Sequence, residues 1–148
     1  LWMYMPNISR PIRLTKSRSF MGSTFSNEDI SDTSWENNYD AEITKVRKDS
    51  VLLVLAAKRR DVSYARIEMW VNEEKRFPVE AHYYGLSGRQ VRKMSFSNVK
   101  EMAGRLRPLD MKMEDMLEEG AYTEVKLISM EELKEVPDYY FDQTQMGR

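Results

Sequence analysis

Four stretches of this chain alternate apolar and polar side chains, and this period of two limits the chain to a fold built on β-strands. Successive side chains of a strand point to opposite faces of the sheet, so each stretch has one buried and one wet face. Several such strands in succession predict an antiparallel sheet with one apolar face. The apolar members are Ala65, Ile67, Met69 and Val71; Val79, Ala81 and Tyr83; Leu109, Met111 and Met113; and Thr123, Val125 and Leu127.

Length and charge narrow the class of protein. The 148 residues suffice for one domain with a hydrophobic core, over residues 1–148. With 23 Lys and Arg against 24 Asp and Glu, spread along the strands, the charges predict solvated faces and no nucleic-acid partner. The sequence contains no run of 18 apolar residues, so it predicts no transmembrane helix. The longest apolar run, 51–57, is typical of a central strand covered on both faces.

The chain opens on a strand-like alternation without an initiator methionine. We therefore expect a piece of a longer protein, with a signal peptide in the precursor if one exists. Cysteine is absent, which excludes disulfides, thiol catalysis and cysteine metal sites within these residues.

Turn residues divide the chain into strands. A hairpin over 1–5 and 11–16 precedes a polar segment, 17–35, that nevertheless carries large apolar residues, as a loop folded over something apolar would. Ser26 and the acidic residues after it predict the start of a short helix. A second helical turn is expected over 131–135, capped by Ser129. The main strands are expected over 43–46, 51–59, 63–72, 77–85, 89–100, 106–116 and 121–129.

Catalytic and metal signals are weak. The single histidine, His82, lies on the polar side of its strand, and the turn containing Ser87 lacks the nucleophile-elbow pattern. Glu28, Asp29 and Asp32 are close together, but a solvated helix start explains them better than a metal site. We predict no catalytic residues, no metal and no cofactor.

Methionine is abundant, with 11 residues, several of them on the inward side of predicted strands. Its flexible, polarizable side chain suits surfaces that adapt to variable apolar partners. The alternative is that these methionines simply pack in an ordinary hydrophobic core. The inward position of the side chains, taken alone, favours this alternative. The shortage of predicted helices to cover the sheet favours a ligand surface instead.

Several motifs together resemble the outer-membrane lipoprotein-sorting proteins, in the superfamily of the periplasmic lipoprotein carrier LolA. Residues 2–6 (W-M-Y-M-P), followed by Arg10, resemble that group's W-x-Y-x-P strand and the basic strand after it. Residues 19–29 resemble a loop close to F-M-G-S-D-F-S-Y-E-D, with Thr24 where Asp is common and Asn27 where Tyr is common.

Later motifs extend the resemblance over nearly the whole chain. Residues 67–71 and 77–79 are similar to a W-V-D … P-L-K hairpin, 84–88 to a Y-D-x-x-G turn, and 136–141 to a closing L-P-D-x-x-F. The resemblance implies a mainly β fold, an open antiparallel half-barrel around an apolar cavity with short helices as a lid. This chain would be the C-terminal portion, with the N-terminal helix and strands missing.

The resemblance also implies a function. The chain would be a non-catalytic periplasmic carrier or binding protein for lipoprotein acyl chains or another lipid, either free in the periplasm or lipid-anchored in the cell envelope. An inner-membrane exporter and an outer-membrane acceptor are the implied protein partners, and an exposed strand edge would permit an oligomer. The residues predicted to contact lipid are Met3, Met5, Ile12, Leu14, Phe20, Met21, Phe25, Ile67, Met69, Met94, Phe96, Met111 and Met113.

Two other classes of function remain open from the sequence. One is a lipid hydrolase in which His82 serves Ser87 or another serine. The other is an envelope scaffold or exporter accessory protein that binds through a sheet edge and holds no ligand.

Overall fold

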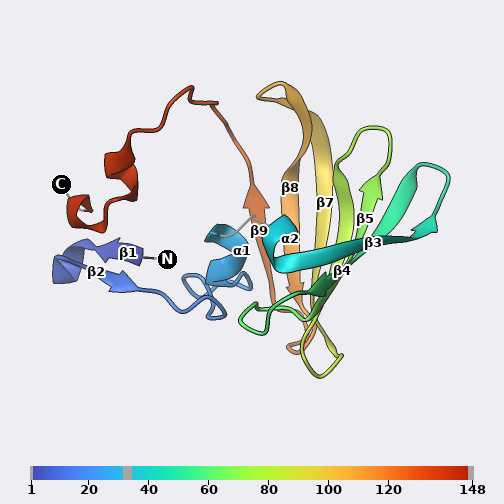
Figure 1. The fold of residues 1–148 in the computed structure, drawn as a ribbon, viewed down its shortest axis with the longest axis horizontal. Helices are drawn as coiled ribbons and strands as arrows, with labels where there is room; N and C mark the ends of the chain where they lie inside the picture. Colours follow the sequence, from blue (N-terminus) through green and yellow to red (C-terminus); the bar gives the residue numbers. More distant parts are fainter. Residues whose placement is uncertain (1, 32–34, 147–148) are drawn as a thin grey trace.

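A computed structural model describes residues 2–31 and 35–146, and its main feature is one large antiparallel sheet (Figure 1). Seven strands lie in chain order, each paired with its neighbour in sequence, and the sheet is not closed into a barrel. This confirms the predicted open, mainly β architecture. The strands are β3 (Tyr39–Val46), β4 (Ser50–Ala57), β5 (Arg66–Asn72), β6 (Pro78–Tyr84), β7 (Gln90–Met102), β8 (Arg105–Asp115) and β9 (Tyr122–Lys126).

The alternation in the sequence becomes one continuous apolar face because the strand registers align it. Ile67 lies opposite Tyr83, and Met69 lies opposite Ala81. Ala81 in turn lies opposite Met94 on the next strand. Residues directly opposite each other on antiparallel strands share a face, so the apolar members of five strands form the inner surface of the sheet.

Strand β4 differs from its prediction as a central strand covered on both faces. It is the second strand of the sheet, beside the edge strand β3. Val51, Leu52 and Leu55 are buried, but Ala56 is exposed. The outer face is therefore covered only at the start of the strand, where Leu52 pairs with Trp70.

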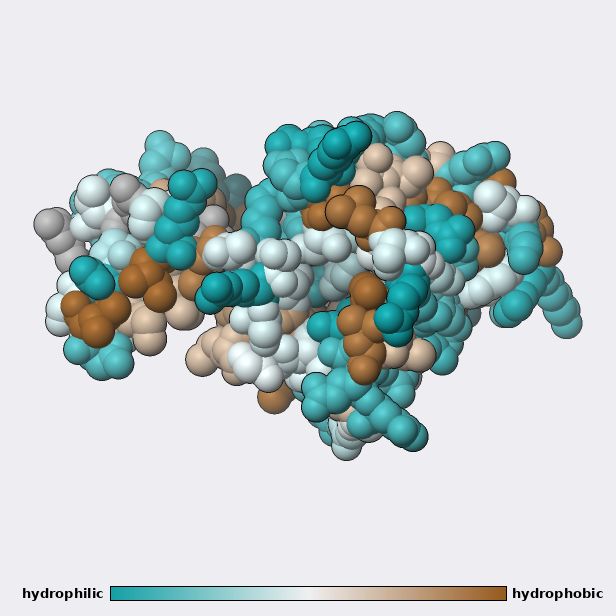
Figure 2. All heavy atoms as spheres, turned by 90° about the horizontal axis from the view of Figure 1, so that it is seen from below, coloured by the Kyte–Doolittle hydropathy of each residue, from teal (hydrophilic) through white to brown (hydrophobic). Residues whose placement is uncertain are grey.

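A separate two-stranded hairpin lies apart from the large sheet. It consists of β1 (Trp2–Met5), the 3-10 helix η1 (Pro6–Ile8) and β2 (Arg10–Arg13). The C-terminal segment leaves β9 and returns to this hairpin through two further 3-10 helices, η2 (Asp138–Phe141) and η3 (Gln143–Gln145) (Figure 1). Apolar side chains remain visible on the surface of the lobe that these segments form (Figure 2).

Two short α-helices lie between the hairpin and the large sheet, α1 (Asn27–Ser31) and α2 (Trp35–Asn38). Helix α1 confirms the helix start predicted at Ser26, whereas α2 has no counterpart among the elements predicted from the residues. Neither they nor any other helix in the described part of the chain is long and apolar enough to cross a membrane.

The helical turn predicted over 131–135 is wrong. That segment forms no helix and is exposed, and the nearest helix is η2, which begins after Pro137 rather than ending before it. A single helical turn has an unfavourable nucleation cost unless tertiary packing offsets it. The exposed side chains of Leu133 and Val136 show that packing does not do so here.

Candidate functional site

An apolar cavity of about 460 Å³ lies between the inner face of the sheet and the two α-helices. The sheet supplies one wall, mainly from the strands β5 to β9, with Tyr39 at the start of β3 beside it. The residues of that wall are Ile67, Met69, Val71, Pro78, Tyr83, Met94, Phe96, Met111 and Val125. Register explains their convergence, since Phe96 lies opposite Met111 and Met111 lies opposite Val125.

The helices and the loop before them supply the opposite wall. Phe25, Ile30 and Trp35 face the cavity from this side. Phe25 is buried and belongs to the main hydrophobic core, whereas Ile30 is 46% exposed. We call this second wall, formed by the loop before α1 and by the two α-helices, the lid. The lid has one firmly packed apolar residue, Phe25, and others that are only partly covered.

Helix α1 begins with a reciprocal cap, as its sequence predicts. The backbone N–H of Asp29 donates to Ser26 Oγ at 3.1 Å, and the backbone N–H of Ser26 donates to Asp29 Oδ2 at 2.7 Å. This is a capping box in which Asp replaces the more usual Glu. It fixes the orientation of α1 and hence of the lid.

The acidic residues of α1 are not solvated, which corrects the sequence interpretation. Glu28 is 8% exposed, and its Oε2 accepts hydrogen bonds from both the backbone N–H and the hydroxyl of Ser63. Asp29 Oδ2 accepts a hydrogen bond from the Tyr64 hydroxyl at 2.9 Å. Asp32, the third residue of that acidic group, lies outside the described residues. The carboxylates thus attach the lid helix to the loop between β4 and β5.

Burial shapes the acid–base properties at this end of the cavity. It raises the pKa of the Asp29 carboxyl above its usual value, outweighing the hydrogen bonds from Ser26 and Tyr64. Burial also raises the pKa of the Tyr64 hydroxyl, and the neighbouring Asp29 adds to that increase. The pKa of Tyr83 rises mainly through burial as well. Both phenols are therefore neutral at physiological pH.

A polar contact holds the loop before α1 against the far strands of the sheet. The Thr24 hydroxyl donates to the carbonyl of Met113 at 2.9 Å, and its backbone N–H donates to Thr123 Oγ1 at 3.0 Å. Arg92 Nε donates to the Thr24 carbonyl at 3.1 Å and pairs with Asp115 at 2.8 Å through its Nη1. These bonds place the next residue, Phe25, in the core.

Six of the residues predicted to contact lipid lie together in the cavity wall. They share inward positions on the sheet or the packed end of the lid loop. They are Phe25, Ile67, Met69, Met94, Phe96 and Met111. Their contact with a lipid stays a prediction.

Seven other predicted residues lie elsewhere. Met113 is fully buried in the core. Met21 is 79% exposed, with a left-handed backbone (φ 50°), and Phe20 beside it is half-buried. The remaining four lie on the separate hairpin or just after it, where they are half-buried and outside the cavity wall: Met3, Met5, Ile12 and Leu14.

Sequence reasoning missed the polar and aromatic part of the cavity. Tyr39, Tyr64 and Tyr83 all line it, and the Tyr39 hydroxyl donates to the Tyr64 carbonyl at 3.1 Å. Tyr83 had a signal, because it belongs to the alternating set of its strand. Trp35 and Ile30 had only the general signal of large apolar residues in a polar segment.

The catalytic and metal candidates gain no support from the described residues. The ring of His82 contacts Glu80 Oε1 at 2.7 Å through Nε2 and Gln90 Nε2 at 2.9 Å through Nδ1. His82 pairs with Glu68 and Lys93 on the outer face, whereas the cavity lies on the inner face. Within residues 2–31 and 35–146, no three His, Cys, Asp or Glu side chains form a metal-binding group. That the chain is not an enzyme stays a prediction.

Comparisons with known proteins place this fold among LolA-like structures. The chain is 29% identical to a LolA superfamily protein from Nitrosomonas europaea, with a TM-score of 0.72 over 95% of this chain and 65% of that one. It is 27% identical to a DUF1329 family protein from Desulfovibrio piger, with a TM-score of 0.84 over 97% of this chain and 62% of that one.

A third structure, an outer membrane lipoprotein-sorting protein domain from Vibrio parahaemolyticus, has a TM-score of 0.88 at 23% identity. It aligns with 99% of this chain and 65% of its own length. The chain thus spans less than two thirds of each of these three proteins. A family model described as "Uncharacterized protein" matches residues 1–148. No curated protein matches the chain.

Proposed function

Because the chain belongs to the family whose model matches residues 1–148 and has the LolA-like fold, we propose that it holds acyl chains in its apolar cavity. The observation that carries the proposal is the cavity itself, with its wall of Met, Phe, Ile and Val side chains. Similarity to the LolA superfamily protein and the lipoprotein-sorting domain supports a carrier or binding role for lipoproteins or other lipids.

The energetics suit a non-covalent carrier. Burying an acyl chain in an apolar environment is favourable by about 0.8 kcal/mol per methylene, whether that environment is a bilayer or a protein cavity. A chain can therefore move between the two only if the cavity offers comparable apolar burial. The flexible side chains of Met69, Met94 and Met111 can repack around chains of different shape.

The proposed location is the periplasm, in solution or attached to the envelope by lipid, since lipoprotein sorting to the outer membrane takes place there. An inner-membrane exporter as donor and an outer-membrane protein as acceptor are part of the same proposal. The lipid that is carried is to be identified by analysing the cargo bound to the protein in its native envelope.

The first test is native mass spectrometry of the full-length protein purified from its own envelope, followed by organic extraction. We expect a bound lipid or acylated peptide. A cargo-free mass, together with no uptake of a fluorescent fatty acid, would refute the carrier role and favour an envelope scaffold.

A cavity-filling variant makes the test specific to this site. Val125→Phe adds volume where the wall faces the cavity, so it should reduce fatty-acid uptake while the protein remains folded. Val46→Phe makes the same change at a position that is 70% exposed on the edge strand β3 and should leave uptake unchanged. Equal uptake by both variants would show that the fatty acid binds outside this cavity.

A further inference from the structure

Two basic segments that are distant in sequence lie on opposite walls of one cleft outside the cavity. Residues 10–18 contain four Lys and Arg and no acidic residue, and residues 58–61 contain three with one Asp. The whole chain has a net charge of −1. The fold therefore brings the Lys and Arg residues of two separate segments together at one place on the protein.

The cleft has a volume of about 590 Å³ and lies between the segment after β2 and the loop between β4 and β5. Arg13 and Lys16 line one wall, and Arg60 lines the other. The hydroxyl-bearing residues Thr15 and Ser17 also line it. Phosphate oxygens accept hydrogen bonds from guanidinium, ammonium and hydroxyl groups, and this cleft presents all three.

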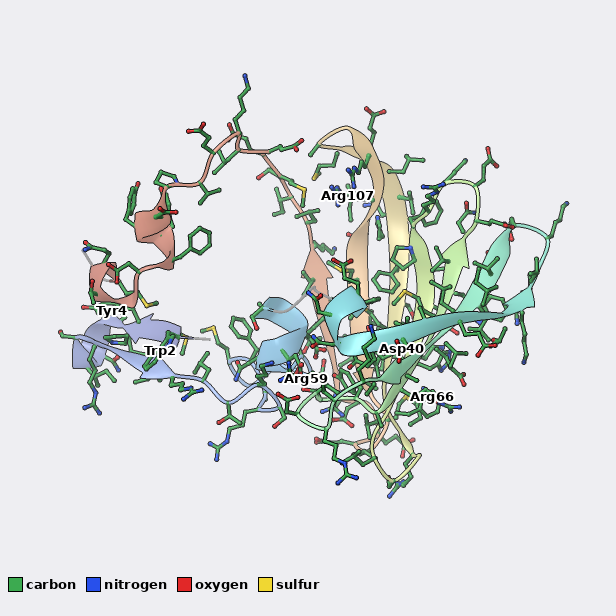
Figure 3. The ribbon with its side chains drawn as sticks, viewed as in Figure 1. Trp2, Tyr4, Asp40, Arg59, Arg66 and Arg107 are labelled. Carbon is green, nitrogen blue, oxygen red and sulfur yellow. The ribbon has the colours of Figure 1, made fainter. Side chains whose placement is uncertain are left out.

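The one acidic residue in the cleft is already paired. Asp61 accepts two hydrogen bonds from Arg59, at 2.8 and 2.6 Å, and this pairing holds the pKa of its carboxyl below the usual value. Arg59 lies in the loop between β4 and β5 (Figure 3). Among the described residues, Arg13 and Arg60 form no ion pair. The cleft therefore has a net positive charge.

Both walls are fixed to the same helix, so the backbone of the cleft keeps its shape. The Thr15 carbonyl accepts a hydrogen bond from Asn27 Nδ2 at 2.7 Å, and the Lys16 carbonyl accepts one from the backbone N–H of Glu28 at 2.9 Å. On the other wall, Ser63 donates to the Glu28 carboxylate. Because the walls are already ordered, binding an anion costs only the ordering of the cationic side chains.

We propose that this cleft binds the phosphate group of an anionic ligand through Arg13, Arg60 and Lys16. The phosphate can belong to a phospholipid head group at a membrane surface or to a small soluble phosphate compound. The site is distinct from the acyl-chain cavity, because the two share no lining residue.

The test compares the full-length protein with two double variants. Arg13→Gln with Arg60→Gln removes two charges from the cleft. Arg89→Gln with Arg105→Gln removes two charges that are also exposed, from distant hairpin turns. One arm measures binding to vesicles of equal parts phosphatidylglycerol and phosphatidylcholine, against phosphatidylcholine alone. The other arm titrates inorganic phosphate and follows chemical-shift changes.

We expect the wild type and the distant-charge variant to bind the anionic vesicles, and the cleft variant to bind about 30-fold more weakly, as two lost surface charges imply. Phosphate shifts lost only in the cleft variant would identify a site for soluble phosphate. Vesicle binding without such shifts would identify the lipid head group.

Binding to neither probe, or equal losses in the two double variants, would overturn the proposal. Each variant's thermal unfolding is measured in parallel, and Arg60→Gln alone, with an expected loss of about fivefold, serves if the double variant unfolds. Uptake of a fluorescent fatty acid by the cleft variant should be unchanged, so failure of this site and failure of the cavity are distinguishable.

Discussion

The carboxylate of Asp29 accepts a hydrogen bond from the Tyr64 hydroxyl at 2.9 Å, joining the lid helix to the loop between β4 and β5. The same oxygen accepts the backbone N–H of Ser26. Burial nevertheless raises the pKa of this carboxyl. The position therefore needs a hydrogen-bond acceptor, while its negative charge is unfavourable there.

Replacing Asp29 separates these two properties. Asp29→Asn keeps a carbonyl oxygen as acceptor and removes the charge, so we expect its unfolding free energy at pH 7 to equal or exceed that of the wild type. Asp29→Ala removes the acceptor and should cost about 1–3 kcal/mol. Urea denaturation of both variants measures the difference, and an Asn variant as unstable as the Ala variant would contradict it.

The pH dependence of this effect has a definite sign. Between the ordinary carboxyl pKa and the raised value of Asp29, the folded protein binds more protons than the unfolded chain, so Asp29 lowers stability as pH rises through that window. The advantage of Asp29→Asn over the wild type should therefore be absent below pH of about 4 and should grow above it. Denaturation curves at several pH values test this, and an advantage that shrinks with rising pH would refute it.

Met113 of β8 should contribute strongly to the stability of the fold, although it does not line the cavity. Met113 is 0% exposed and packs in the main core, so Met113→Ala should lower the unfolding free energy by about 2–5 kcal/mol. Met21→Ala, at a position 79% exposed, should change it by less than about 0.5 kcal/mol. Similar losses in both variants would show that Met21 is covered in solution.

Arg92 should hold the lid loop in place. Arg92→Leu removes both its bond to the Thr24 carbonyl and its ion pair with Asp115, so we expect a loss of about 1.5–3 kcal/mol. Chymotrypsin should then cleave faster at Phe20 in the loosened loop. The double variant Arg92→Leu with Asp115→Asn removes the charge left without its partner and keeps an oxygen for the backbone N–H groups of the following turn, so it should recover part of the stability. Unchanged cleavage of Arg92→Leu would exclude the anchoring role.

His82 offers a direct test of the hydrolase alternative. Its ring bonds to Glu80 and Gln90 on the outer face of the sheet. We therefore expect His82→Ala to leave acyl-chain binding unchanged. If the purified protein hydrolyses a lipid ester and His82→Ala abolishes that activity, the carrier interpretation is incomplete.

The strands could be predicted from sequence because their signal is local. Ile67, Met69 and Val71 alternate with polar residues within one strand, and turn residues mark its ends. Pairing in chain order then brought the inward methionines into one wall. This is why Met69, Met94 and Met111, which have inward parity in the sequence, line one cavity.

The lid and the hairpin were harder because their environment depends on distant residues. Glu28 and Asp29 look like a solvated helix start until Ser63 and Tyr64, 35 residues away, are brought beside them. Met3 and Met5 have an inward parity, but parity does not reveal that their strand belongs to a separate small sheet. The basic cleft likewise combines two segments that are unremarkable when read separately.

The strict chain order of the seven strands has a consequence for the route of folding. Each strand pairs only with its sequence neighbours within this sheet, so the sheet can grow hairpin by hairpin with short loop closures. The bond between Thr24 and Thr123 instead spans 99 residues and needs β9 to be in place. We therefore expect the lid to form last and to open first, with the sheet intact beneath it.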